Sequence, residues 1–215
     1  MIRAQARTIP LHPAPAAEDA ARADWYALIA RLFQSPPDAA LLSRIAGAAG
    51  EVGEVVEQGI ASELERAFGA LAQASGQAGA DAVRAEYETA FLGVGKPEVF
   101  LQASYYLAGF LHERPLAELR ARLAELGVAR RGDVSETEDH VAALCEVMRF
   151  LITSDDPALS ALDTQRSFFS RFLSPWCDAL CDAIEHAGST DYYKHAGRLA
   201  RAFFAVERQA FDFDS

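Results

Sequence analysis

Apolar side chains recur every three or four residues along almost all of this 215-residue chain, and this spacing limits its fold more than any other feature. Between Val141 and Ile152, for example, Leu144, Cys145 and Met148 fall on the same side of a helix. No stretch alternates apolar and polar residues at the period of two typical of a half-buried strand. Val, Ile and Thr are also sparse beside Ala and Leu. The spacing therefore predicts an all-α fold.

Prolines, glycines and polar clusters divide the pattern into about ten helices. We expect them over residues 18–33, 38–45, 54–74, 80–92, 101–112, 115–126, 135–152, 157–172, 175–187 and 190–210. Ser135 and Glu138 have the spacing of a capping box, which predicts that a helix starts there. Ser174 and Pro175 are typical of an N-cap and a first turn. Residues 1–17, interrupted by prolines, are expected to be a flexible tail, and residues 18–215 a single globular multi-helix domain.

Charge and cysteine content narrow the class of protein. The formal net charge is −11, so we expect no nucleic-acid partner, because such partners require a basic surface. A basic partner and a merely solubilising surface both remain open. The chain has no apolar run of the roughly 18–20 residues that a membrane span needs, and no apolar core of a secretory signal. Three cysteines in apolar stretches suit a reducing compartment, so we expect a cytoplasmic protein without membrane insertion.

Several motifs of catalytic and metal sites are incomplete or missing. Gly93 to Lys96 has neither the spacing nor the following Ser or Thr of a phosphate-binding loop. Cys177 and Cys181 share a helix face but have no second ligand pair, so buried thiols are favoured over a zinc site. No Glu-x-x-His motif of a di-iron bundle and no Gly-x-Ser-x-Gly elbow occurs. We therefore assign no catalytic residue, no metal and no cofactor from motifs.

An acidic cluster around a histidine is the first candidate site. Glu136, Asp139 and His140 lie at the predicted start of a helix, where the helix dipole favours carboxylates without any function. The dipole does not favour a protonated His140, which Glu136 could partner from one turn away. Two interpretations stay open: a capped helix start, or a site that binds or performs acid–base chemistry.

Aromatic residues form a second candidate. One group flanks the Gly93–Pro97 loop and another lies further along the chain, namely Phe91, Phe100, Tyr105, Tyr106 and Phe110, then Phe168, Phe169, Phe172 and Trp176. Core packing is the default interpretation for most of them. An apolar groove with acids at its rim would instead suit a peptide with basic and apolar parts.

The order of these motifs resembles the TorD/DmsD/NarJ family, in particular its TorD-like branch. The similar blocks are Arg22–Phe33, Glu86-Tyr87 with Phe91-Leu92-Gly93, Ser104-Tyr105-Tyr106, Glu136–His140, Gln165–Trp176, Tyr192-Tyr193 and the final aromatic helix. Thr137 stands where the family often has a proline. The resemblance covers about residues 20 to 210, and the shared order is more specific than any single block.

The resemblance implies a binding protein and not an enzyme. Members of the family are cytoplasmic chaperones that hold the twin-arginine signal peptide, or the apoprotein, of a molybdopterin oxidoreductase until its cofactor is inserted. A client of the DMSO reductase or formate dehydrogenase type is expected. The resemblance also implies weak guanine nucleotide binding and a monomer or homodimer, with residues 127–132 as a hinge for helix exchange. The alternative is a small helical enzyme that uses Glu136, Asp139 and His140.

The expected client-binding residues follow from this resemblance and from peptide chemistry. Carboxylates at Glu136 and Asp139 could pair with the two guanidinium groups of the peptide, and aromatic side chains could hold its apolar run. The expected contacts are Glu86, Phe91, Ser104, Tyr105, Tyr106, Glu136, Asp139, His140, Phe169 and Trp176.

Overall fold

The computed structural model describes residues 17–48, 60–93, 95–111, 114–129 and 136–213. Within these ranges every regular element is helical, and an isolated bridge between Gln102 and His140 is the only β pairing. The elements are α1 (Ala17–Gln34), α2 (Ala39–Ala48), α3 (Ile60–Gln77), α4 (Ala80–Tyr87), the π-helical turn η2 (Glu88–Leu92), α5 (Ala103–Ala108), α6 (Arg114–Glu125), α7 (Val141–Thr153), α8 (Pro157–Ser160), α9 (Leu162–Phe172), α10 (Ser174–His186) and α11 (Tyr192–Phe213). The prediction of an all-α fold is confirmed. The tail expected over residues 1–17 lies outside the described residues, except that Ala17 opens α1.

The predicted capping box at the start of α7 is wrong. Helix α7 begins at Val141, five residues after Glu136, and His140 is its N-cap. Glu138 lies in a turn before the helix, and Ser135 is outside the described residues. The physical reason is that the backbone of Asp139 and Val141 is hydrogen-bonded to the segment before α5, which holds it out of a helix until His140.

Other boundaries also differ from the predicted ones. The helix expected over 101–112 is shorter, because α5 spans only Ala103–Ala108 and closes on Gly109 in the left-handed conformation. The helix expected over 157–172 is two helices, because Thr164 and Gln165 donate side-chain hydrogen bonds to carbonyls of α8 and Ala161 adopts an extended conformation. The end of the 80–92 helix is π-helical, closed by the bond from the Gly93 N–H to the Glu88 carbonyl. Ser174 is the first residue of α10 and not its N-cap.

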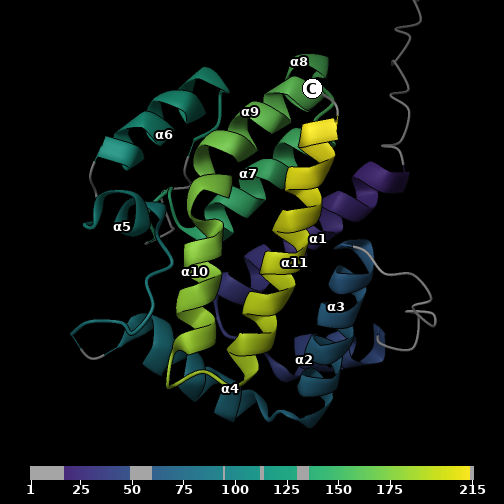
Figure 1. Cartoon of the computed structure of the whole chain (residues 1–215), viewed down its shortest axis with the longest axis vertical. Helices are drawn as coiled ribbons and strands as arrows, with labels where there is room; N and C mark the ends of the chain where they lie inside the picture. Colours follow the sequence, from purple (N-terminus) through teal and green to yellow (C-terminus); the bar gives the residue numbers. More distant parts are fainter. Residues whose placement is uncertain (1–16, 49–59, 94, 112–113, 130–135, 214–215) are drawn as a thin grey trace, which may run out of the picture.

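The helices form two groups joined by longer ones (Figure 1). Helices α5, α6, α8 and α9 lie at one end of the molecule, and α2, α3 and α4 lie at the other. Helices α10 and α11 run side by side between the two groups, and α1 crosses behind them and packs mainly against α7. This arrangement makes one domain of the described residues.

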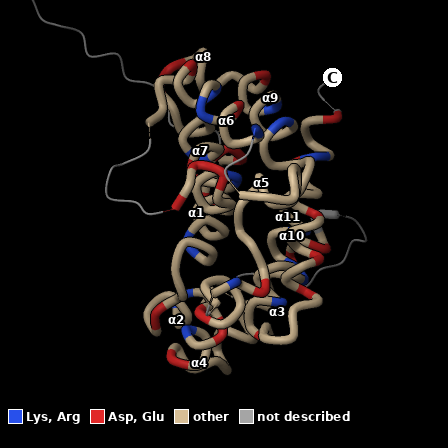
Figure 2. The backbone as a smooth tube through the Cα atoms, turned by 90° about the vertical axis from the view of Figure 1, so that its left-hand side faces the viewer, with Lys and Arg blue, Asp and Glu red and all other residues tan. Residues whose placement is uncertain are grey.

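Acidic and basic residues are mixed over the described helices, and the basic ones do not collect into one stripe (Figure 2). Many of them pair locally. Arg208, Arg201 and Arg198 of α11, for example, form ion pairs with acidic residues of α10 along the seam between the two helices. No described helix combines the length and apolar character that a bilayer span requires.

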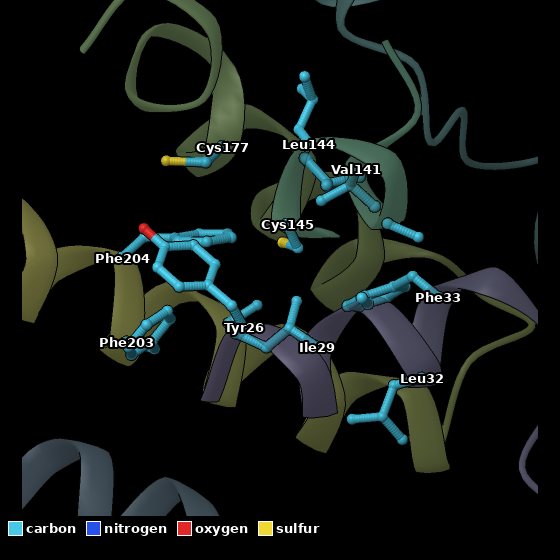
Figure 3. Packing of buried hydrophobic residues seen from close by; sticks show 14 of the residues in the cluster. Tyr26, Ile29, Leu32, Phe33, Val141, Leu144, Cys145, Cys177, Phe203 and Phe204 are labelled. Atoms are coloured by element: carbon cyan, nitrogen blue, oxygen red, sulfur yellow. The ribbon is translucent and has the colours of Figure 1, made fainter. Parts of the chain in front are cut away.

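The core forms where α1, α7, α10 and α11 meet (Figure 3). Tyr26 of α1 packs against Phe203 of α11 with a ring centroid distance of 4.7 Å and lies near Cys145 of α7, while Phe33 of α1 packs against Phe91 and Tyr193. Tyr26, Phe33, Cys145 and Phe203 are buried completely or almost so. The three cysteines are buried free thiols. Burial raises the pKa of Cys177 to about 11, so this thiol behaves as a small apolar side chain.

Candidate functional site

The candidate site is built around a crossing of two segments, residues 101–104 and 137–141. The Val141 N–H donates to the Leu101 carbonyl over 2.8 Å, and the Ala103 N–H donates to the Asp139 carbonyl over 3.0 Å. These bonds fix the entry of α5 against the entry of α7. Two helices whose first residues, Ala103 and Val141, are 38 apart in the sequence therefore begin at one place.

Asp139 is the central side chain of this crossing. It is 1% exposed. One carboxylate oxygen, Oδ2, accepts the Ser104 N–H over 2.9 Å, and the other, Oδ1, accepts the Thr137 hydroxyl. The carboxylate thus satisfies a backbone donor in the first turn of α5, where the helix has no partner of its own.

His140 has an equivalent role for α7. Its Nδ1 accepts the Ala142 N–H over 3.2 Å, so the neutral ring carries its proton on Nε2. Burial lowers the pKa of His140, against the opposing influence of Glu136 and Asp139. Glu136, expected one helical turn before the imidazole, lies in a bend before α7 and not in the helix.

A pocket opens beside the crossing, between α5, α6, α7 and α9. Its volume is about 310 Å³. The walls are mostly apolar, and the residues that line it are Ala103, Leu107, Ala108, Pro115, Leu119, Leu144 and Phe172, with the polar residues Arg114, Glu118, Asp139 and Arg171. At the rim, Glu118 pairs with Arg114 over 2.8 Å and with Arg171 over 2.9 Å.

Large apolar side chains are exposed on the same part of the chain. Leu107 and Leu111 are partly exposed, and Phe110 is 72% exposed, the largest value among the exposed large hydrophobics of the described residues. Leu107 also lines the pocket, and several exposed apolar side chains within five residues are typical of a protein–protein contact. We call Leu107, Phe110 and Leu111 the apolar ridge.

Aromatic stacking attaches α5 to α10. The Tyr106 ring stacks on Trp176 with a centroid distance of 5.5 Å, and its hydroxyl donates to the Phe100 carbonyl over 2.8 Å. Tyr105 stacks on Phe100 at 4.1 Å. The Trp176 Nε1–H is used internally, donating to the Phe172 carbonyl. The structure thus brings Ser104, Tyr105, Tyr106, Asp139, His140 and Trp176 together around α5.

Similarity to known proteins identifies the family of this chain. The sequence model for the family described as nitrate reductase delta subunit matches residues 57–182, more than half of the chain. The chain belongs to this family. It is the family that the motif order already indicated, and the resemblance is confirmed.

Curated relatives agree with this membership, and a solved structure shares the fold. A "Chaperone protein TorD" of Vibrio cholerae El Tor is 27% identical over 60% of this chain and 61% of its own, so the match spans less than two thirds of that relative. The protein of the same name from the Classical Ogawa strain is 27% identical over 73% and 74%. The crystal structure of a candidate redox enzyme maturation protein from Archaeoglobus fulgidus has the same fold, with a TM-score of 0.54 at 16% identity over 92% and 98%.

Three of the expected contact residues lie away from α5 in this family member. Glu86 accepts the backbone N–H groups of Asp191 and Tyr193 over 2.8 and 2.7 Å, and that of Tyr192 over 3.1 Å, at the start of α11. Phe91 packs in the core against the ring of Tyr193. Phe169 is also in the core, against Phe204 and Phe211. Their assignment to client binding stays a prediction.

Two polar groups of structural importance were not selected from the sequence. Glu207, 1% exposed, forms an ion pair with Arg22 over 2.7 Å and accepts the Tyr26 hydroxyl over 2.9 Å. Glu98 accepts the Gly188 N–H over 2.6 Å. Arg22, Tyr26 and Glu207 all belong to the blocks that resemble the family, but 185 residues separate the two ends of the ion pair, and no local pattern joins them.

The acid–base alternative gains no support from the geometry. Both oxygens of Asp139 and the Nδ1 of His140 already accept hydrogen bonds, which leaves fewer lone pairs to take a proton from a substrate. Among the described residues, no three His, Cys, Asp or Glu side chains gather as a set of metal ligands. What the arrangement offers is an apolar pocket with one wall on the short helix α5, and an apolar ridge that begins on α5 and continues past its end.

Proposed function

We propose that this chain is a cytoplasmic maturation chaperone for a molybdopterin oxidoreductase. It binds the twin-arginine signal peptide, or the apoprotein, of an enzyme of the DMSO reductase or formate dehydrogenase type, and holds it for cofactor insertion before export or assembly. Family membership and the relatives named as TorD chaperones support this. The observation that carries the proposal is the apolar pocket of about 310 Å³ next to the apolar ridge.

The chemistry of a signal peptide suits this surface. The apolar run of the peptide would bury the side chains of the apolar ridge and enter the pocket, as in other grooves that accept an amphipathic segment. The arginine pair would remain in the negative field of the chain, whose net charge is −11. Glu136, which is partly exposed, is the acidic residue of the original cluster best placed to meet a guanidinium group.

Peptide binding can be measured directly. A labelled twin-arginine signal peptide from a molybdoenzyme of the same host is titrated with the purified chain, and binding is followed by fluorescence anisotropy. We expect saturable binding, weakened by about tenfold or more in Phe110→Ser, because one large apolar contact is lost. Phe150→Ser is the matched control, since Phe150 is 43% exposed on α7 and does not line the pocket.

The proposed function can be overturned by experiment. A wild-type chain that binds neither the signal peptide nor the apoprotein, and that recovers no molybdoenzyme on purification from its host, would overturn the proposal. If Phe110→Ser and Phe150→Ser weakened peptide binding equally, the chaperone function would stand, but the binding surface would not lie at α5 and the apolar ridge. Weak guanine nucleotide binding and a homodimer, both expected from the resemblance, stay predictions.

A further inference from the structure

We infer that Asp139 and His140 are positioning residues, which hold the client-binding helix α5 in place and do not contact the client through their polar atoms. This inference rests on the proposed function. It assigns to the Asp-His pair a role different from the direct pairing with guanidinium groups that was expected from the sequence.

The first argument is that both side chains are almost completely buried. Asp139 is 1% exposed and His140 is 3% exposed. Although Asp139 reaches the pocket wall, its two oxygens accept from Ser104 and Thr137. A guanidinium ion would find almost no exposed surface on this carboxylate, and it would have to share oxygens that already hold Ser104 and Thr137.

The second argument is that α5 cannot hold itself. It has only six residues, far fewer than an isolated helix needs in water. At its start it depends on the Asp139 carboxylate and on the Asp139 carbonyl, which accepts from Ala103 over 3.0 Å. At its other end it closes on Gly109 in the left-handed conformation. Asp139 is thus the main polar anchor of α5 from outside its own segment.

The third argument is what α5 carries. Ala103, Leu107 and Ala108 form one wall of the pocket, and Leu107 also begins the apolar ridge. If the start of α5 frays, this wall moves relative to Leu119 of α6 and Phe172 of α9. Affinity for the client would then fall although no contact atom had been removed.

His140 completes the anchor from the other side of the crossing. Its ring caps α7, and the Val141 N–H that follows bonds to the Leu101 carbonyl, just before α5. The pair therefore fixes two helix starts with adjacent residues. A change at either side chain is transmitted through the backbone of residues 101–104 to the pocket wall.

Conservative substitutions separate positioning from contact. In Asp139→Asn the amide oxygen can accept from Ser104 and the amide group can donate to the Thr137 hydroxyl, so the cap is kept and the charge is lost. We expect Asp139→Asn to bind the signal peptide within about threefold of wild type, and Asp139→Ala to bind about fivefold to tenfold more weakly. His140→Asn and His140→Ala should differ in the same direction, because Asn is a good N-cap.

Hydrogen–deuterium exchange of the free protein supplies the second measurement. Peptides that cover residues 103–111 should exchange faster in Asp139→Ala than in wild type, and near the wild-type rate in Asp139→Asn. Asp38→Ala is the matched control, because Asp38 caps α2 through the Leu41 N–H over 2.8 Å. It should lower the melting temperature and leave both client affinity and the exchange of residues 103–111 unchanged.

Two results would overturn the inference. One is a loss of affinity in Asp139→Asn as large as in Asp139→Ala while α5 keeps its protection, which would mean that the client needs the charge. The other is unchanged exchange of residues 103–111 in Asp139→Ala. If the wild-type chain binds no client at all, the proposed function fails, and the exchange experiment still decides whether Asp139 anchors α5.

Discussion

A buried carboxylate, that of Glu207, holds two other side chains of this fold, Arg22 and Tyr26. The Glu207 carboxylate accepts two guanidinium N–H groups and the Tyr26 hydroxyl, and the Arg22 side chain is 15% exposed. Arg22 also lies over the Phe211 ring, 5.4 Å from its centroid. Removal of Glu207 would leave the Arg22 guanidinium without its main carboxylate partner next to the core.

We expect Glu207→Ala to lower the free energy of unfolding by about 3–5 kcal/mol, because Tyr26 loses its acceptor and Arg22 keeps only the partly exposed Asp19, 3.2 Å away. Urea unfolding followed by circular dichroism measures this. Glu146→Ala is the control, since Glu146 and Arg149 form an ion pair in which each side chain is almost half exposed, and its cost should be about 0.5 kcal/mol or less. Similar costs for the two variants would contradict the prediction.

His140 gives the stability a dependence on pH. Its pKa in the fold is lowered from the ordinary 6.5 by burial, so below about pH 6.5 the unfolded chain binds more protons than the folded one. The contribution is complete above pH 6.5 and declines as the pH falls below it. Between about pH 7.5 and about pH 5.5, wild type should lose more stability than His140→Asn in urea unfolding. Equal losses would show that His140 does not titrate differently in the two states.

At the scale of elements, the turn after η2 depends on one glycine. Gly93 has φ +57° and ψ 160°, a backbone conformation that residues other than glycine hardly adopt. A Cβ atom there would lie 2.4 Å from the Lys96 carbonyl oxygen. Gly95 also has a positive φ, of 93°, but a Cβ atom at this position meets nothing within 4 Å.

The two glycines therefore form a matched pair. Gly95→Ala should cost about 1 kcal/mol through its backbone conformation alone, and Gly93→Ala at least about 2 kcal/mol, since backbone atoms of Lys96 and Pro97 would also have to move. The comparison of their urea midpoints measures the difference. A cost for Gly93→Ala no greater than that for Gly95→Ala would mean that the turn rearranges freely.

A helix boundary could be predicted from the sequence where a nearby residue caps the helix, and could not where a distant segment supplies the cap. The end of α6 could be, because Gly127 lies two residues after Glu125, the last residue of the helix, and has φ +69°. The starts of α5, α7 and α11 could not, since these depend on bonds between segments distant in sequence. Glu86 supplies acceptors for α11 from more than 100 residues away. Residue types at local spacing carry no information on such bonds.

The candidate site was predictable to a similar extent. The residues around α5 were identified because their blocks stand in the family order, and the structure does bring Asp139, Tyr106 and Trp176 together. The apolar ridge was not identified, although Phe110 was noted among the aromatic residues. Helical spacing cannot distinguish an aromatic side chain in the core, such as Phe169, from one exposed to solvent.

At the scale of the whole molecule, the net charge of −11 should raise the association rate of a basic client. Because long-range attraction acts mainly on association, the on-rate of a twin-arginine peptide should fall by about tenfold between low and high salt, with little change in the off-rate. Stopped-flow fluorescence measures both rates. A peptide with both arginines replaced by Gln is the control, and an equal salt dependence for this peptide would contradict electrostatic steering.

The position of α1 has a consequence for how the chain folds. Six of its residues are buried, and its last carbonyl groups accept the hydroxyls of Tyr87 and Tyr193, 54 and 161 residues further along. Until α7 and α11 arrive, α1 exposes an aromatic and aliphatic surface that nothing nearby in sequence can cover. Closing such long loops slows folding relative to a bundle of sequential neighbours. A newly synthesised copy of this chain therefore passes through a stage in which α1 exposes apolar surface and is prone to associate with other chains, like the clients proposed for it.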